Sequence, residues 1–288
     1  MLLSMTGQGV ANATANGVTV TVEMRAVNNR HLKINLRSPD SLITLESLVE
    51  KTIRASVGRG TINVNIKVQK ETRADDFAID TALLNSYRSQ LQAEARDEIP
   101  LKALLTLPGV VKSSEALSPH TAHSELIMET LGEALEHFNQ MRTTEGEALG
   151  HDLATQLQNL AILIQSIRER APAVVVNYSS RLTDKLNQLL EKHNVTLSDA
   201  DLTREIGVFA DRCDITEEVV RLDSHIAQFN EVMNSNTSQG RKLDFITQEL
   251  FREINTIGSK ANDASIAGFV VEAKTVIERV REQVQNIE

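Results

Sequence analysis

One apolar stripe at helical spacing, from Ser124 to Ala171, limits the possible folds more than any other feature of this 288-residue chain. Its members are Leu131, Leu135, Phe138, Leu149, Leu153, Leu157, Leu160, Ile164 and Ile167. An uninterrupted helix of this length would extend ~70 Å, further than a globular domain is wide. We therefore expect either a break at Gly146 or Gly150 or a helical arm that projects from the molecule. Pro172 is expected to stop or kink the helix.

The residues before this stripe are expected to form mainly strands. Apolar and polar side chains alternate in three segments, 18–25, 32–36 and 62–68, and a period of two is typical of half-buried strands. The segment 3–9 is a fourth candidate strand. Helical spacing of apolar residues over 45–53 predicts one helix, which would cover one face of a small antiparallel or mixed sheet.

Everything after about Asp80 is expected to be helical. The last stretch repeats apolar residues every three or four positions, and such a seam usually packs against another helix, in the same chain or in another subunit. Its members are Val270, Ala273, Ile277, Val280, Val284 and Ile287. The chain is thus predicted to be an α+β protein. We place its parts at 1–122, a small β-sheet with a helix, 123–200, a long-helix arm or hairpin, and 201–288, a helical C-terminal domain.

The charge balance excludes a polycation that coats nucleic acid, because the net charge is −9. The charge is uneven, however. Residues 1–71 carry nine basic and five acidic side chains, a net of +4, and the other residues together carry −13. The N-terminal quarter could therefore face a polyanion, although a chance imbalance of solvated surface charge would look the same.

The chain is expected to be cytoplasmic and to have no membrane segment. The single cysteine, Cys213, rules out an intrachain disulfide and fits a reducing compartment. No apolar run approaches the ~20 residues of a membrane span, and the N-terminus lacks a signal-peptide pattern. Glycine-rich nucleotide-binding motifs are absent, so no nucleotide cofactor is expected. Two Tyr, no Trp and seven Phe provide no aromatic platform for stacking bases.

Polar side chains on the C-terminal helices are the best candidates for chemistry. Glu249 and Glu253 are four residues apart, so on a helix their carboxylates share a face. Glu218, Arg221 and His225 share a face in the preceding segment. A carboxylate and an imidazole on one face can bind a divalent cation or transfer a proton near neutral pH. Solvated helical ion pairs would show the same spacing, and the spacing alone favours that interpretation.

Basic and amide side chains of the N-terminal segment form a second candidate zone. Arg25, Arg37 and Arg59 are spread over expected strands and helix ends, and Arg30 lies in an expected turn beside Asn28. Guanidinium and amide groups are suitable donors to backbone phosphates. An ordinary solvated sheet face is the alternative, and these residues alone favour it.

Several motifs, in order along the whole chain, resemble the YicC/YloC-like endoribonuclease family. They are 4–9 (SMTGQG), 23–32 (EMRAVNNRHL), 37–39 (RSP), 107–109 (LPG), 142–146 (RTTEG), 210–218 (ADRCDITEE), 240–245 (GRKLDF), 255–260 (NTIGSK) and 281–288 (REQVQNIE). Gln8 departs from the pattern, because the family often has an aromatic residue there.

The resemblance implies a metal-dependent endoribonuclease that cuts single-stranded regions of RNA. It also implies a ring-like homo-oligomer, a homohexamer, that encloses the substrate. In such a ring the basic N-terminal zone would line a cavity while acidic surface faces outward. This arrangement would reconcile the negative net charge with binding of RNA.

Together with the residue patterns, the resemblance predicts a role for each candidate residue. The expected ligands of an Mn²⁺ or Mg²⁺ ion are Glu218, Glu249 and Glu253, with Asp211 and Asp214 as further candidates. His225 is expected to act as general base, general acid or ligand. The groups expected to neutralise charge on the scissile phosphate are Arg221, Arg241, Lys242 and Lys260. The groups expected to hold the RNA backbone are Arg25, Asn28, Arg30, Arg37 and Arg59.

Two other classes of function stay open at this point. A non-catalytic RNA-binding adaptor or assembly scaffold would use the same basic surface and would hold RNA intact with or without Mn²⁺. A metal-dependent hydrolase of another phosphodiester would be inhibited by small nucleotides.

Overall fold

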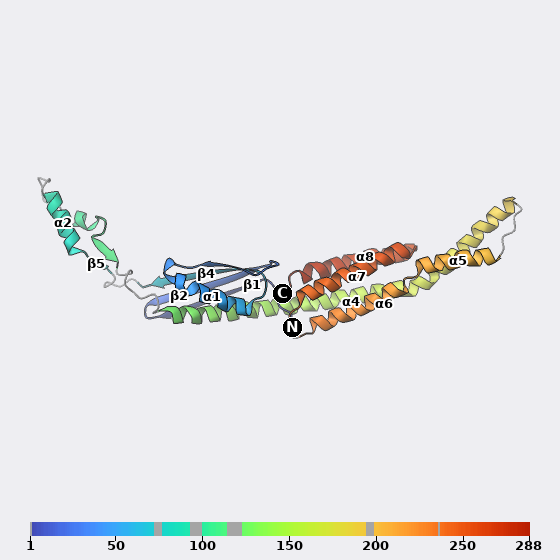
Figure 1. The fold of residues 1–288 in the computed structure, drawn as a ribbon, viewed down its shortest axis with the longest axis horizontal. Helices are drawn as coiled ribbons and strands as arrows, with labels where there is room; N and C mark the ends of the chain where they lie inside the picture. Colours follow the sequence, from blue (N-terminus) through green and yellow to red (C-terminus); the bar gives the residue numbers. More distant parts are fainter. Residues whose placement is uncertain (1, 72–76, 93–99, 114–122, 194–198, 236) are drawn as a thin grey trace.

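The computed structural model describes residues 2–71, 77–92, 100–113, 123–193, 199–235 and 237–288. It confirms the predicted α+β class, because a small N-terminal sheet, one very long helix and a group of C-terminal helices follow one another along an elongated molecule (Figure 1). The proposed part boundaries after residues 122 and 200 stay predictions. None of the helices in the described part of the chain is long and apolar enough to cross a membrane.

Four strands form the N-terminal sheet, in the order β1 (Gly7–Ala15), β2 (Val18–Val27), β4 (Thr61–Lys70) and β3 (Lys33–Arg37). β1 and β4 run antiparallel to β2, and β3 runs parallel to β4. Alternation predicts β2, β3 and β4 well. β1 lies further along the chain than the expected 3–9, because glycine and alanine occupy its buried positions and give little apolar signal.

Two helices cover the same face of this sheet. α1 (Ile43–Ser56), which follows a 3₁₀ turn at Asp40–Leu42, and the first part of α4 (Ser124–His193) share one apolar core with the strands. Val49 and Ile53 of α1 are buried in that core. The opposite face of the sheet is left to polar side chains.

α4 is one continuous helix of 70 residues, ~105 Å long. Of the two outcomes expected at Pro172, the stop is wrong, because the helix continues through this residue to His193, and the kink stays a prediction. Ile167 and Val174, on either side of the proline, are both buried in the C-terminal core. This packing offsets the backbone hydrogen bond that a proline ring removes.

Two glycines allow other segments to approach α4 closely. Gly146, a candidate break, is helical, and a Cβ added to it would lie 2.2 Å from the carbonyl oxygen of Leu2. Gly9 of β1 plays the same part on the sheet, since its Cβ would lie 2.0 Å from the carbonyl oxygen of Ala134. Glycine is therefore required at both positions for contact between backbones rather than for flexibility.

Four helices follow α4: α5 (Asp199–Cys213), α6 (Thr216–Met233), α7 (Gly240–Lys260) and α8 (Ala264–Val284). α6, α7 and α8 pack along the middle of α4 around one apolar core (Figure 1). The seam predicted in the last stretch lies on α8 and is buried in this core. Its partner helices therefore belong to the same chain.

A small separate unit lies at the end of the molecule opposite α5 (Figure 1). It contains β5 (Phe77–Ile79), α2 (Thr81–Gln92), α3 (Leu101–Leu105) and β6 (Val111–Ser113). β5 and β6 pair antiparallel.

The two ends of the described chain meet in the middle of the molecule (Figure 1). The backbone N–H of Met5 donates to the carbonyl of Asn286 at 2.8 Å, and that of Glu288 donates to the carbonyl of Leu3 at 2.9 Å. Arg142 of α4, 1% exposed, pairs with the Glu288 carboxylate. We call this region, between the sheet and the C-terminal helices, the junction.

Candidate functional site

The two polar faces predicted on the C-terminal helices meet between α6 and α7. The pairs are Glu218 with Lys260, Arg221 with Glu253, and His225 with Glu249. The first two are ion pairs with N–O distances of 2.7 and 3.5 Å. Residue numbers rise along one helix as they fall along the other, so the helices are antiparallel. Spacings of three and four residues on α6, and of four and seven residues on α7, thus become a ladder of cross-helix contacts.

Among the described residues, His225, Glu249 and Glu253 form a group of possible metal ligands, which we call the His–Glu–Glu cluster. One ligand atom of each residue lies within 4.8 Å of the other two. Glu253 is only 3% exposed. The buried Nδ1 of His225 has no hydrogen-bond partner among the described residues. An imidazole with two carboxylates suits a divalent first-row cation such as Mn²⁺, and three protein ligands leave positions for water and substrate.

Arg221 lies at the edge of this cluster. One guanidinium nitrogen, Nη1, is 3.5 Å from Glu253 Oε1, and Nη2 binds the carboxylate of Glu217. The negative charges of Glu217 and, secondarily, Glu253 raise the pKa of Arg221. Arg221 therefore holds one oxygen of Glu253 and keeps a positive charge beside the cluster.

Glu218, predicted as a metal ligand, lies one step further along the ladder and outside the cluster. Its Oε1 accepts a hydrogen bond of 2.7 Å from Lys260, and its buried Oε2 has no partner among the described residues. The bond to Glu218 raises the pKa of Lys260, whose Nζ also donates to the Asp214 carbonyl at 3.3 Å. The structure thus brings Glu218 to a lysine and holds that ammonium group at the end of α7, one step of the ladder beyond Glu253.

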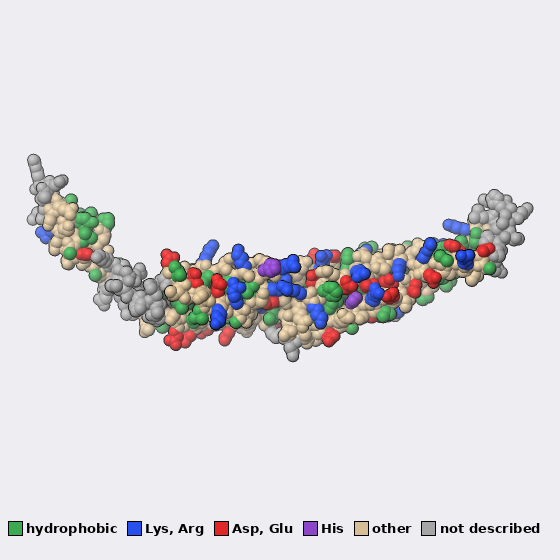
Figure 2. Space-filling view, viewed as in Figure 1, with side chains coloured by type: hydrophobic (Ala, Val, Ile, Leu, Met, Phe, Trp, Pro, Cys, Tyr) green, Lys and Arg blue, Asp and Glu red, His purple; other side chains and the backbone are tan. Residues whose placement is uncertain are grey.

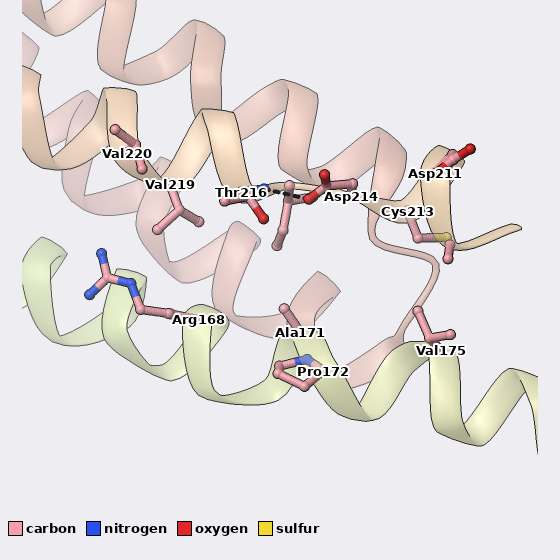
Figure 3. Close-up of a pocket in the computed structure, with 12 residues that line it drawn as sticks. Arg168, Ala171, Pro172, Val175, Asp211, Cys213, Asp214, Thr216, Val219 and Val220 are labelled. Atoms are coloured by element: carbon pink, nitrogen blue, oxygen red, sulfur yellow. Dashed lines mark hydrogen bonds between the residues drawn. The ribbon is translucent and has the colours of Figure 1, made fainter. Parts of the chain in front are cut away.

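Asp211 and Asp214, the further candidate ligands, line a separate hollow of about 500 Å³ between α4 and the α5–α6 connection (Figure 3). Asp214 Oδ1 accepts a hydrogen bond of 2.9 Å from the backbone N–H of Thr216. Hydrogen bonds from Thr216 lower the pKa of Asp214. Asp214 therefore helps to start α6, and Asp211 carries its carboxylate away from α4 at the far end of the hollow (Figure 3).

Arg25 and Arg37 lie on the polar face of the sheet. The register places Arg25 between Gln8 of β1 and Asn63 of β4, and places Asn63 beside Asn35 of β3. One polar row therefore crosses all four strands. Asn35 Nδ2 donates to Asn63 Oδ1 at 2.9 Å, and the row lines a hollow of about 710 Å³. Alternation does not single out Gln8 or Asn35, because it shows which residues share a face but not which strands are neighbours.

Arg30 and Arg59 lie elsewhere, at the junction, where they line a hollow of about 490 Å³ with Arg241. Asn28 lies there too and donates Nδ2 to the carbonyl of Gln285 at 2.7 Å, which ties the sheet to the end of α8. The five predicted RNA contacts thus divide into a sheet group and a junction group. Lys and Arg side chains gather over the middle of the molecule, beside the chain ends (Figure 2).

Arg241 and Lys242, predicted to neutralise charge at the reaction centre, also belong to the junction. Both lie in the first turn of α7, where Lys242 and Arg59 line a second hollow. Arg241 precedes Glu249 by eight residues, or ~12 Å along the helix axis. The structure therefore places these two cations apart from the His–Glu–Glu cluster.

Comparisons with known proteins give consistent matches over the whole chain. Residues 2–151 match the family model described as "Endoribonuclease YicC-like, N-terminal region", and residues 167–288 match "Endoribonuclease YicC-like, C-terminal". A "Probable endoribonuclease YicC" of Clostridioides difficile is 32% identical over 294 residues. A protein of the same description from Haemophilus influenzae is 31% identical over 293 residues. Both matches cover 100% of this chain and 100% of the relative.

Proposed function

This chain belongs to the YicC-like endoribonuclease family, and on that premise we propose that it is a divalent-metal-dependent endoribonuclease that cuts single-stranded regions of RNA. The observation that carries the metal part of the proposal is the His–Glu–Glu cluster. Its members come from two helices and lie with their ligand atoms within 4.8 Å of one another.

The cluster fits a small divalent cation for three reasons. Its donors are an imidazole and two carboxylates, which suit Mn²⁺ and, through their oxygens, Mg²⁺. The Nδ1 of His225 is a buried nitrogen that has no hydrogen-bond partner among the described residues. Glu253 is almost fully buried and has one positive partner, Arg221, at 3.5 Å; a bound cation would add a second compensating charge to this buried carboxylate. When bound, the cation would lower the pKa of a water or polarise the scissile phosphate.

The residues around the cluster would position RNA and stabilise charge. Arg221 is paired with Glu253, and Lys260 lies one step further along the ladder; their positive charges would meet negative charge that develops on the phosphate. Glu218 orients the ammonium group of Lys260. If His225 is not a ligand, its imidazole is the group of the cluster best suited to accept or donate a proton near neutral pH.

We extend the proposal to a homo-oligomer, a homohexameric ring in the cytoplasm. Val220, Phe245 and Val271, on three C-terminal helices, are 62%, 62% and 65% exposed and are the side chains that we expect such an assembly to cover. The cytoplasmic part rests on the single cysteine. Light scattering of the purified chain would test the assembly, and a monomer at micromolar concentration would contradict it.

The test of the activity is cleavage of an end-labelled, partly single-stranded RNA with Mn²⁺, with Mg²⁺ and with EDTA. We expect cutting with metal and none with EDTA. The double variant Glu249→Gln/Glu253→Gln should lose the activity by at least about 100-fold, because both carboxylates leave the metal site. Glu272→Gln, an exposed glutamate on α8, is the matched control and should cut at the rate of the unaltered chain.

Each alternative has its own outcome in this experiment. RNA that stays intact in every lane, yet is bound and then released by salt, would contradict the enzyme and favour the RNA-binding adaptor. Strong inhibition by small nucleotides would favour a hydrolase of another phosphodiester. Mn²⁺ binding, measured by calorimetry without RNA, reports on the cluster independently of any cleavage.

A further inference from the structure

Three arginines from three separate elements converge at the junction. Arg30 lies in the connection between β2 and β3, Arg59 in the connection between α1 and β4, and Arg241 in the first turn of α7. They line one hollow of about 490 Å³, together with Asn28 and a single acidic residue, Asp244. The ionised side chains of the lining thus sum to a positive charge of +2.

The charges in this hollow repel one another. Burial, and then the neighbouring charges of Arg241 and Arg30, lower the pKa of Arg59, and Asp244 only partly compensates. The Nε–H of Arg59 is buried and finds no acceptor among the residues that the structure describes. Such an arrangement is costly in an empty hollow and becomes favourable when an anion enters.

The donors suit a phosphate better than other anions. Arginine guanidinium groups are planar forks that bind phosphate oxygens through paired N–H donors, and several forks can share one tetrahedral group. The amide of Asn28 is already engaged with the end of α8, so it braces the hollow. In the described residues, the lining offers no aromatic ring on which a base could stack.

We propose that the junction hollow formed by Arg30, Arg59 and Arg241 binds a backbone phosphate of single-stranded RNA and thereby anchors the strand at the start of α7, about two helical turns before the His–Glu–Glu cluster. The inference rests on the proposed function for the identity of its ligand. Arg241 lies ~12 Å along α7 from Glu249, a distance that a few nucleotides span. Because Arg59 and Arg241 come from opposite sides of the junction, the bound phosphate also holds the sheet and the C-terminal helices together.

The test measures binding without cleavage. A fluorescein-labelled oligouridylate is titrated in EDTA at several salt concentrations, and its anisotropy gives Kd. Arg59→Gln and Arg241→Gln should each weaken binding by about tenfold. Each should also reduce the slope of log K against log salt by about 0.7, because one phosphate contact to a single strand is lost. The control is Arg54→Gln, which removes an exposed arginine of α1 paired with Glu50. It should change neither the Kd nor the salt slope.

A competition experiment distinguishes the RNA backbone from a free nucleotide or inorganic phosphate as the source of the bound phosphate. Uridine monophosphate and inorganic phosphate are added to the complex of the unaltered chain with the oligouridylate. Displacement only at concentrations far above those of unlabelled oligouridylate supports the RNA backbone as ligand. Displacement at equal nucleotide concentration would overturn that assignment and make the hollow a mononucleotide site.

Failure of this inference differs from failure of the proposed function. Unchanged Kd and salt slope in folded Arg59→Gln and Arg241→Gln would overturn the phosphate site while metal-dependent cleavage could still hold. Loss of binding in these variants, with no cleavage by any form, would support the phosphate site and contradict the nuclease. Circular dichroism establishes folding, and Arg241 is an exposed residue whose replacement leaves the core intact.

Discussion

Lys260 Nζ lies 2.7 Å from Glu218 Oε1 and so joins the last turn of α7 to the first turn of α6. This bond raises the pKa of Lys260 above its ordinary value of 10.5. A lysine with a raised native-state pKa adds stability that is complete below the unfolded pKa and is lost as pH rises through the raised one. The pair therefore stabilises the fold at neutral pH and ceases to do so in strong alkali.

Glu218→Gln is expected to remove this contribution. The denaturation midpoint of the variant should lie below that of the unaltered chain at neutral pH, and the two should converge as pH rises above the raised pKa of Lys260. Urea denaturation at a series of pH values measures this. If the difference between the midpoints of the variant and the unaltered chain stays the same through the alkaline range, the ion pair is not the cause of that difference.

Arg221→Gln should separate metal binding from catalysis. The guanidinium competes with a cation for Glu253 and repels it, so the variant should bind Mn²⁺ several-fold more tightly by calorimetry. Half of the Arg221 side chain is exposed, so solvent limits the gain. Cleavage should nevertheless slow, because a positive charge beside the phosphate is lost. Weaker Mn²⁺ binding in the variant would contradict the competition.

Asp263→Ala should destabilise the start of α8. Asp263 Oδ1 accepts from the backbone N–H groups of Ser265 and Ile266, and its carboxylate pairs with Arg170 of α4 at 3.0 Å. Loss of such a cap costs about 1 kcal/mol of unfolding free energy. Asp263→Asn, which keeps an acceptor for the cap but loses the charge, should cost less.

The stability that Asp263 contributes depends on pH in the opposite direction to the stability that the Lys260–Glu218 pair contributes. The bond to Arg170, more than any other contact, lowers the pKa of Asp263. Its contribution is therefore complete above the ordinary carboxyl pKa of 3.8 and is lost as pH falls through the lowered value. Thermal unfolding at acid pH should show Asp263→Ala approaching the unaltered chain. A constant difference down to the lowest pH would assign the loss to packing.

Gly9→Ala should destabilise the contact between β1 and α4 by about 1–3 kcal/mol, since the added Cβ would lie 2.0 Å from the Ala134 carbonyl oxygen. Gly132→Ala, in α4 itself, is the matched control: nothing lies within 4 Å of its Cβ position. There the same substitution should stabilise the helix by about 0.5–1 kcal/mol. Chemical denaturation compares the two variants, and equal shifts would refute a steric role for Gly9.

Much of the fold can be predicted from the periodicity of apolar residues, and the predictions that are wrong have physical causes. Valine and isoleucine at every second position locate β2, β3 and β4. The same rule misplaces β1, because Gly7, Gly9 and Ala11 are buried without being large or apolar enough to give a signal. The stop expected at Pro172 is wrong, and the burial of Ile167 and Val174 on either side of the ring offsets the lost hydrogen bond; a kink there stays a prediction.

Some contacts of the candidate site can be predicted from the sequence, and others cannot. Spacing along one helix predicts that Glu249 and Glu253 share a face, and the structure has them in one cluster. Partners across helices depend on tertiary packing, which spacing does not contain. The contact of Glu218 with Lys260 is therefore not predictable from spacing, and neither is the approach of Arg30 and Arg59 to Arg241 at the junction.

The junction also sets an order of events during synthesis. Met5 and Leu3 share backbone hydrogen bonds with Asn286 and Glu288, so residues 3–5 wait until residues 286–288 have been made. At the usual rates of translation this delay is on the order of tens of seconds. The sheet and α1 can fold during that time, but the N-terminal segment that crosses the junction stays without its partner strand. Closure of a loop that spans nearly the whole chain is therefore expected to be a late and slow step of folding.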